Sequence, residues 1–439
     1  MQQMNRNILK LAIPNIVSNV TVPLLGMVDT AISGRLGDAV AIGALGIGST
    51  IFNMIYWTCG FLRMGTSGIT AQAYGARNLR ECGNILLRAL TVACGIALLL
   101  VVFRHPVGTF ALGLMQGSPS AQMLAGQYFH ARIWAAPASL ALFAIHGWFI
   151  GMQNSKTPMI VSIVSNVINI LFSWLFVFRF GMGIAGIAWG TVIAQYSGVV
   201  LSAAIWLLYY RRLAKYIDLA QLLDIKSLLR FFNINRDIFI RTLFLVSVYT
   251  FFTAASSRFG DTILVTNTLL MQLYTLFSYI SDGFAFAAES LAGRYVGARN
   301  RTALKDAVSK LIIWCFGIAL LYVAVYLVAW RPILAVFNPS PEVFAVAREY
   351  IVWIIAVPLA GCLPFLIDGI LLGATQTRLL RNTMIIAAAI YFGLYFVTVN
   401  TLGNNALWLS FVTFVAMRGV LLMAATRNLS PDRLIARSE

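Results

Sequence analysis

The chain has 439 residues, of which 60% are hydrophobic and only 11% charged, and its mean hydropathy is +0.82. Charged residues make up about 25% of an ordinary soluble domain, so this composition excludes a soluble protein of this size and indicates a chain folded in lipid. The net charge of +17 raises the question of nucleic-acid binding. Because the basic residues are dispersed between apolar segments and form no patch, we expect no nucleic-acid partner.

Twelve apolar stretches follow one another, each long enough to cross a bilayer, which takes about 20 residues. They are residues 8–33, 40–73, 82–103, 122–151, 158–178, 184–210, 238–257, 262–296, 308–330, 344–374, 382–402 and 406–426. They predict an all-α membrane protein with twelve transmembrane helices. The first is too long for the apolar part of a signal peptide. The second, fourth, eighth and tenth exceed the minimum, which indicates tilt, kinks or projecting ends.

Positive charges are distributed unequally between the two ends of these helices. Of the 32 Lys and Arg residues, 24 fall on the side of the N terminus, among them Arg241 and Arg418. Seven, including Arg132, fall on the opposite side, and Arg63 lies inside the second stretch. The positive-inside rule therefore predicts that both termini are cytoplasmic.

Short motifs recur at a nearly constant displacement. At 222 residues, 74–78 matches 296–300, and His146-Gly147 with Gly151 matches Asp368-Gly369 with Gly373; at 223 residues, 35–38 matches 258–261. Three matches in almost one register indicate an internal repeat. We therefore expect two pseudo-symmetric six-helix lobes, related by an axis along the membrane normal, with the substrate route between them.

This repeat divides the chain into three parts. They are an N-terminal lobe, residues 1–210, a basic cytoplasmic linker, residues 211–236, and a C-terminal lobe, residues 237–439. The Leu-rich part of the linker, residues 219–232, can form a helix that lies on the anionic inner leaflet. It can equally be a plain tether.

Asp29, in the first apolar stretch, is the strongest candidate for a functional residue. An ionisable group at membrane depth costs a few kcal/mol to place and rarely persists without a role. Asp29 lies about 8 to 12 Å from the outer end of its helix, counting 1.5 Å per residue. Its carboxylate can hold a proton, because burial disfavours the charged form, or it can supply oxygens to Na⁺. The fifth stretch has a polar stripe of Ser162, Asn166, Asn169 and Ser173. By the same rise, Ser173 and Thr191 of the sixth stretch lie at a depth similar to that of Asp29.

Other ionisable residues lie inside later stretches. Asp282 and Glu289 are seven residues apart and share a helix face, so they can form an acidic track for cations or protons, or pair with Arg294 or Arg63. Asp368 lies about 15 Å deep in the tenth helix. Its repeat partner His146 has the same depth and can relay protons or be an ordinary hydrogen-bonded residue.

Motifs for other kinds of chemistry are missing from the sequence. It contains no P-loop, no HExxH and no nucleophile elbow, and its five cysteines lack CxxC spacing. We therefore expect no enzyme activity, no cofactor and no metal site other than a Na⁺ site at Asp29.

Several motifs resemble the multidrug and toxic compound extrusion (MATE) family, within it the DinF-type branch. They are Ile-Pro-Asn-Ile at 13–16, Val-Asp-Thr at 28–30, residues 70–76, Gly-Thr-Val-Ile at 190–193, Asp-Gly-Phe at 282–284, and Asp368-Gly369 followed by residues 373–375. The likeness covers nearly the whole chain. It implies twelve helices in two lobes around a central cleft, and export of cationic or amphipathic compounds in exchange for H⁺ or Na⁺.

The resemblance also implies site residues. The family's cation site in the first lobe maps to Asp29, Asn169 and Thr191, and the bend of its first helix maps to Pro14, with Pro23 a second candidate hinge. Many relatives carry a second aspartate where this chain has Ser173. A site with one carboxylate binds Na⁺ less strongly, so the departure favours protons as the coupling ion.

We therefore expect a monomeric proton-coupled efflux antiporter of the bacterial inner membrane, with small molecules and the lipid bilayer as its partners. One alternative is a lipid-linked saccharide flippase, which would need basic residues in the cleft to hold pyrophosphate, where only Arg63 is available. A second alternative, a membrane-embedded enzyme, would need clustered acids or histidines, and the three histidines are scattered.

Overall fold

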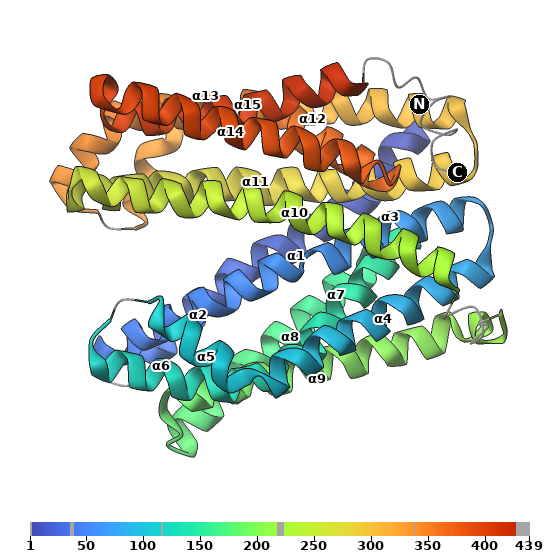
Figure 1. Ribbon diagram of the computed structural model, residues 1–439, viewed down its shortest axis with the longest axis horizontal. Helices are drawn as coiled ribbons and strands as arrows, with labels where there is room; N and C mark the ends of the chain where they lie inside the picture. Colours follow the sequence, from blue (N-terminus) through green and yellow to red (C-terminus); the bar gives the residue numbers. More distant parts are fainter. Residues whose placement is uncertain (1, 36–38, 116, 217–223, 338, 427–439) are drawn as a thin grey trace. The chain divides into compact units, whose positions relative to one another are not determined.

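The computed structural model describes residues 2–35, 39–115, 117–216, 224–337 and 339–426 (Figure 1). In this described part of the chain the regular structure is entirely helical, and twelve helical segments are long and apolar enough to cross a membrane. The predicted all-α fold with twelve spanning helices is confirmed. The helices form two compact units, which we call the N-terminal unit and the C-terminal unit.

The N-terminal unit runs from Val17 to Phe232. It contains the second part of α1 (Gln2–Gly34), followed by α2 (Ala39–Cys59), α3 (Phe61–Gly75), α4 (Leu79–Val102), α5 (Arg104–Gly113), α6 (Pro119–Arg132), α7 (Ala136–Gly151), α8 (Lys156–Trp174) and α9 (Gly183–Tyr209). Within this unit α3 packs on α7, α2 on α6, and α8 on α9.

The C-terminal unit contains the first sixteen residues of the chain, of which 2–16 are described, and the residues from Asn233 onward. Its helices are α10 (Ile225–Ser256), of which residues 225–232 belong to the N-terminal unit, α11 (Asp261–Gly297), α12 (Arg301–Ala335), α13 (Pro341–Gly373), α14 (Thr377–Leu402) and α15 (Asn404–Thr426). Within this unit α11, α12 and α15 all pack on α13. The first part of α1 thus belongs to one unit and the remainder to the other.

Two of the four long apolar stretches are interrupted. Gly60 separates α2 from α3, and a 3₁₀ turn over Ile133–Ala135 separates α6 from α7. The eighth and tenth stretches form the continuous helices α11 and α13, the second of which contains Pro358 and Pro364. In the region predicted as a linker, Arg211–Tyr216 forms 3₁₀ turns and α10 begins at Ile225, while residues 217–223 lie outside the described part.

The internal repeat is visible in the backbone. Among the described residues, four that are not glycine have a positive φ, and they form two pairs displaced by 222: Arg77 (57°) with Arg299 (53°), and Gln153 (62°) with Thr375 (55°). The starts of α6 and α13 repeat in the same way. Their N-cap residues, Ser118 and Ser340, are each followed by proline, and each side-chain oxygen accepts a hydrogen bond of 3.3 Å from a backbone N–H of the first turn. Of the residues in the 35–38 match, 36–38 lie outside the described part.

Glycines bring equivalent helices into backbone contact in both units. A Cβ at Gly147 would lie 3.1 Å from the carbonyl carbon of Arg63, and a Cβ at Gly369 would lie 2.9 Å from the carbonyl carbon of Ala285. Gly369 is displaced from Gly147, and Ala285 from Arg63, by 222 residues. Without a hydrophobic driving force between helices in lipid, such close approaches are a main source of packing energy.

Gly369→Ala is expected to destabilise the C-terminal unit by about 1–3 kcal/mol, because the added methyl group overlaps backbone that cannot move aside. Thermal unfolding of the purified protein in detergent measures the change. The matched control is Gly317→Ala on α12, where an added Cβ meets nothing within 4 Å. The control should leave stability unchanged or raise it by about 0.5–1 kcal/mol. Equal effects of both substitutions would contradict the packing role of Gly369.

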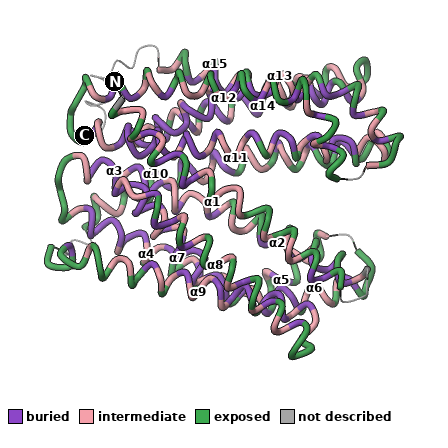
Figure 2. Tube along the Cα trace, turned by 180° about the vertical axis from the view of Figure 1, so that it is seen from behind, coloured by how far each residue is buried: buried purple, intermediate pink, exposed green. Residues whose placement is uncertain are grey.

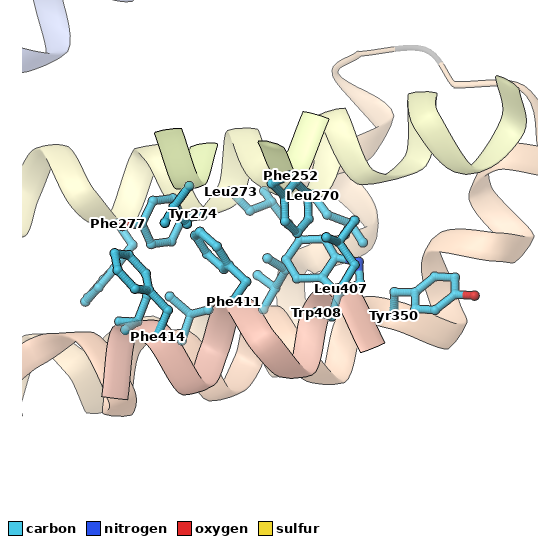
Figure 3. Packing of buried hydrophobic residues seen from close by; sticks show 14 of the residues in the cluster. Phe252, Leu270, Leu273, Tyr274, Phe277, Tyr350, Leu407, Trp408, Phe411 and Phe414 are labelled. Atoms are coloured by element: carbon cyan, nitrogen blue, oxygen red, sulfur yellow. The ribbon is translucent and has the colours of Figure 1, made fainter. Parts of the chain in front are cut away.

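Buried and exposed residues alternate along the same helices (Figure 2). The buried side chains of the C-terminal unit form an aromatic-rich cluster from α10, α11 and α15, with Phe252 packed edge-on against Trp408 and Phe411 (Figure 3). On outward faces, Val328 and Val397 are 84% and 78% exposed. Apolar side chains in such places are expected where the surrounding medium is lipid.

Candidate functional site

Three of the predicted site residues form one buried cluster in the N-terminal unit. Asn169 and Ser173 lie one turn apart on α8, and Thr191 lies opposite them on α9. The Asn169 Nδ2 donates to Thr191 Oγ1 at 2.9 Å, and Ser173 Oγ donates to Asn169 Oδ1 at 3.3 Å. All three are at most 6% exposed. The structure thus brings together the polar residues of α8 and α9 that the sequence placed at one depth.

The backbone around this cluster is adapted to it. Gly190 precedes Thr191, and a Cβ there would lie 2.6 Å from the backbone nitrogen of Ser173, so only glycine lets α9 approach α8 this closely. Directly after Trp174 the helix widens into a π-helical turn over Leu175–Arg179. Such turns are rare in proteins, and those that do occur are often found at functional sites.

Asp29 lies on α1 and is half-buried. Its Oδ1 is buried and finds no hydrogen-bond partner in the described part of the chain. Asn169, Ser173 and Thr191 bond to one another and not to Asp29. Asn166 connects α8 to α1, because its Nδ2 donates to the carbonyl oxygen of Thr21 at 3.4 Å. The carboxylate therefore belongs to the same unit as the polar cluster without being bonded to it.

The charged group that interacts with Asp29 is Arg132. Arg132 is the last residue of α6 and lies inside the helical segment Pro119–Gly151, which is long and apolar enough to cross the membrane. Arg132 was counted as a charge on the side opposite the termini, and its interaction with Asp29 was not predicted. The signal was present in the sequence, since Arg132 falls within the apolar stretch 122–151, but the charge count treated every arginine as a marker of topology.

Asp368 is held by two arginines in the core of the C-terminal unit. Its Oδ2 accepts a hydrogen bond from Arg418 Nη2 at 2.6 Å and another from Arg241 Nη2. Asp368 is 6% exposed, Arg241 5% and Arg418 3%. Arg241 and Arg418, counted among the charges on the side of the N terminus, are therefore buried partners of a carboxylate, a role that the charge count does not predict.

The acids of α11 differ in their surroundings. Asp282 is half-buried, accepts a hydrogen bond from Ser278 Oγ at 3.4 Å, and interacts electrostatically with the hydroxyl groups of Tyr249 and Tyr274, which lie 2.5 Å apart. Glu289 is fully buried, and its backbone carbonyl is the group against which Gly373 packs. The seven-residue spacing of Asp282 and Glu289 predicts that they share a helix face. Of these two side chains, that of Asp282 is partly exposed and that of Glu289 is fully buried.

His146 and Arg63 are neighbours in the N-terminal unit. The backbone of Arg63 on α3 packs against Gly147 on α7, and the Arg63 guanidinium is the charged group that interacts with the His146 ring. The Nε2 of His146 is buried and has no hydrogen-bond partner within the described ranges. The imidazole and the guanidinium thus lie together, apart from the α8–α9 cluster.

Both candidate hinge prolines lie inside α1, Pro14 buried and Pro23 exposed. Pro14 cannot donate a backbone hydrogen bond. The Nδ2 of the next residue, Asn15, donates to the carbonyl oxygen of Leu11 at 2.9 Å. Two residues after Asn15, at Val17, α1 passes from the C-terminal to the N-terminal unit.

Potential metal-binding side chains do not gather into a site for a multivalent metal in the described part of the chain. Within the ranges that the structure describes, no three His, Cys, Asp or Glu side chains gather closely enough to hold a metal ion. In the same unit as the Asp29 carboxylate, the α8–α9 cluster offers amide and hydroxyl oxygens, such as those of Asn169 and Ser173. Such a set can bind a proton at the carboxylate or a weakly held monovalent cation.

Comparison with known proteins agrees with this architecture. The MatE family model matches residues 14–175 and 238–399, one match in each half. DNA damage-inducible protein F of Escherichia coli is 36% identical over 422 residues, covering 95% of this chain and 91% of that protein. A probable multidrug resistance protein NorM of Acinetobacter baylyi is 23% identical, covering 91% of this chain and 90% of that protein. A crystal structure of MATE in the bent conformation matches with a TM-score of 0.88 at 18% identity, covering 99% and 97% of the two chains.

Twelve spanning helices, arranged as two repeated halves with ionisable residues at membrane depth, define a multi-pass membrane transporter. The fold is that of the solved MATE structures. The chain belongs to the MATE family, whose members are transporters and not enzymes.

Proposed function

We propose that this transporter exports cationic or amphipathic small molecules across the bacterial inner membrane in exchange for protons, with both termini in the cytoplasm and Asp29 as the proton carrier. The exported class rests on kinship with a protein named for multidrug resistance. The observation that carries the choice of residue is the buried Oδ1 of Asp29, which has no hydrogen-bond partner in the described part of the chain.

The environment of Asp29 supports protons over Na⁺ as the coupling ion. Ser173 stands where a second carboxylate would strengthen binding of a metal cation, and the Ser173 and Asn169 side chains are already bonded to each other. A cation at this place would have to take oxygens from that cluster. A proton needs only the Asp29 carboxylate.

The coupling of proton entry to export then follows from the change in charge of Asp29. Protonation of Asp29 from the outer side removes a negative charge from α1, and α1 contains Pro14 close to the point where it changes unit. If the two conformations differ in affinity for both the proton and the exported compound, entry of one drives exit of the other.

Flux in proteoliposomes tests the proposal. An imposed proton gradient should drive transport of an ethidium-like cation, whereas a Na⁺ gradient of equal size should not. A bile-salt-like anion in place of the cation tests the substrate class. Transport driven by Na⁺ alone would overturn the coupling, and flux of the anion without the cation would overturn the substrate class.

A further inference from the structure

Arg132 is a fixed positive charge inside the fourth spanning segment. Its Nη1 donates a hydrogen bond to the hydroxyl group of Tyr128, one turn earlier on α6. The guanidinium carbon lies 4.9 Å from the ring centroid of Phe52 on α2 and 5.4 Å from that of Tyr128. Both rings are fully buried. A guanidinium bonded at one end and stacked on two buried rings has little freedom to move.

Neighbours of Asp29 on α1 pack against the buried cluster that contains the two rings under Arg132. Ile32 on α1 belongs to the same buried cluster as Phe52 and Tyr128, and Val28 packs against that cluster. Asp29 precedes Ile32 by three residues, so the two share a face of α1. The Nε of Arg132, like the Oδ1 of Asp29, is buried and has no hydrogen-bond partner in the described part of the chain.

The other groups around this pair carry no formal charge at neutral pH. Tyr56 on α2 and Tyr128 on α6 are the titratable neighbours of Arg132 besides Asp29. The polar cluster of α8 and α9 in the same unit consists of amides and hydroxyl groups, those of Asn166, Asn169, Ser173 and Thr191. In the described part of the N-terminal unit, Arg132 is therefore the charged group that acts on Asp29, and Asp29 is the acid that acts on Arg132.

We propose that Arg132 is the built-in counter-charge of Asp29, and that it makes the site selective for protons over metal cations. Arg132 is a positioning residue, since it acts through Asp29. A guanidinium beside a carboxylate supplies the positive charge that Na⁺ would otherwise supply, and repels a second cation. It also favours release of the proton, because a nearby opposite charge stabilises the ionised form of an acid. This inference rests on the proposed function of Asp29.

Arg132→Gln is the direct test, with transport of an ethidium-like cation into proteoliposomes measured over a range of pH, with and without Na⁺. Without the counter-charge, the pH profile of transport should shift to more alkaline values by about one unit or more. Transport should also begin to respond to a Na⁺ gradient. A merely structural role for Arg132 would lower the amount of folded protein but move neither the pH profile nor the ion response.

The control is Arg104→Gln. Arg104 also lies over a ring, that of Trp134 at 5.3 Å, in the same unit. This variant should keep the wild-type pH profile of transport, and its transport should not respond to a Na⁺ gradient. If Arg132→Gln does not fold, Tyr128→Phe removes only the hydroxyl group that accepts from Arg132 and should shift the profile in the same direction by a smaller amount.

The inference would be overturned if the folded Arg132→Gln variant kept the wild-type pH profile and ion response. If only Tyr128→Phe folds, the same result in that variant would overturn it. The Asp29→Asn variant separates this failure from failure of the proposed function. If Asp29→Asn still transports under a proton gradient, Asp29 is not the carrier. If it does not, and the Arg132 variants behave as wild type, Asp29 is the carrier and only the role of Arg132 is wrong.

Discussion

Asp29→Asn should reduce proton-driven extrusion to the rate of protein-free vesicles while the protein still folds and inserts. Asn has nearly the shape of Asp but cannot change its charge, so the two conformations no longer differ in their affinity for a proton. The Asp29 Oδ1 has no hydrogen-bond partner in the described part of the chain, so the substitution breaks no bond at that atom. The measurement is efflux of a fluorescent cation from vesicles under an imposed proton gradient, with protein amount normalised.

The matched control is Asp261→Asn. Asp261 is an exposed carboxylate at the start of α11, outside the apolar core of that helix. It should transport at the wild-type rate. Extrusion at the wild-type rate by Asp29→Asn would show that Asp29 is not the proton carrier, whatever the result for the control.

Asp368→Leu should be the most destabilising of the substitutions considered, by about 3–5 kcal/mol. Removing one partner of a buried ion pair leaves uncompensated charge in a medium of low dielectric constant. Here the loss leaves two guanidinium groups, those of Arg241 and Arg418, without the carboxylate to which both donate. Loss of folded protein on heating in detergent, followed by size-exclusion chromatography, measures the effect.

A double-mutant cycle separates the buried charge from the lost volume. Asp368→Leu should cost less in an Arg418→Met background than in the wild type, because one of the two uncompensated charges is then absent. Glu342→Gln serves as the control, since Glu342 lies on the same helix but is exposed. Equal costs of Asp368→Leu in both backgrounds would show that the ion cluster does not stabilise the C-terminal unit.

The fold could be predicted from the sequence because its signals are local. Each spanning helix is a run of apolar residues, and the repeat is carried by short motifs such as residues 74–78 and 296–300. These motifs correspond in the structure to repeated turns with positive φ, at Arg77 and Arg299. The interruptions of the second and fourth helices were less visible, since only the excess length of those stretches indicated them.

The site was predictable only in part. Asn169, Ser173 and Thr191 lie on adjacent helices, so helical rise placed them at one depth. The partners of the buried acids could not be found in this way, because Arg241 and Asp368 are 127 residues apart and their contact depends on packing among non-consecutive helices. Arg132, Arg241 and Arg418 all fall inside predicted apolar stretches, where an arginine is expected to pair with an acid or with backbone carbonyls.

Infrared difference spectroscopy, which separates protonated from ionised carboxyl groups, tests most directly whether Asp29 gains and loses a proton. Spectra of the purified wild-type protein are compared between acid and alkaline pH and with those of Asp29→Asn. The account predicts a protonated carboxyl band that appears on acidification in the wild type, diminishes when the exported compound binds, and is absent from Asp29→Asn. The same band in Asp29→Asn, or an Asp29 that stays ionised over the whole pH range in which transport proceeds, would contradict it.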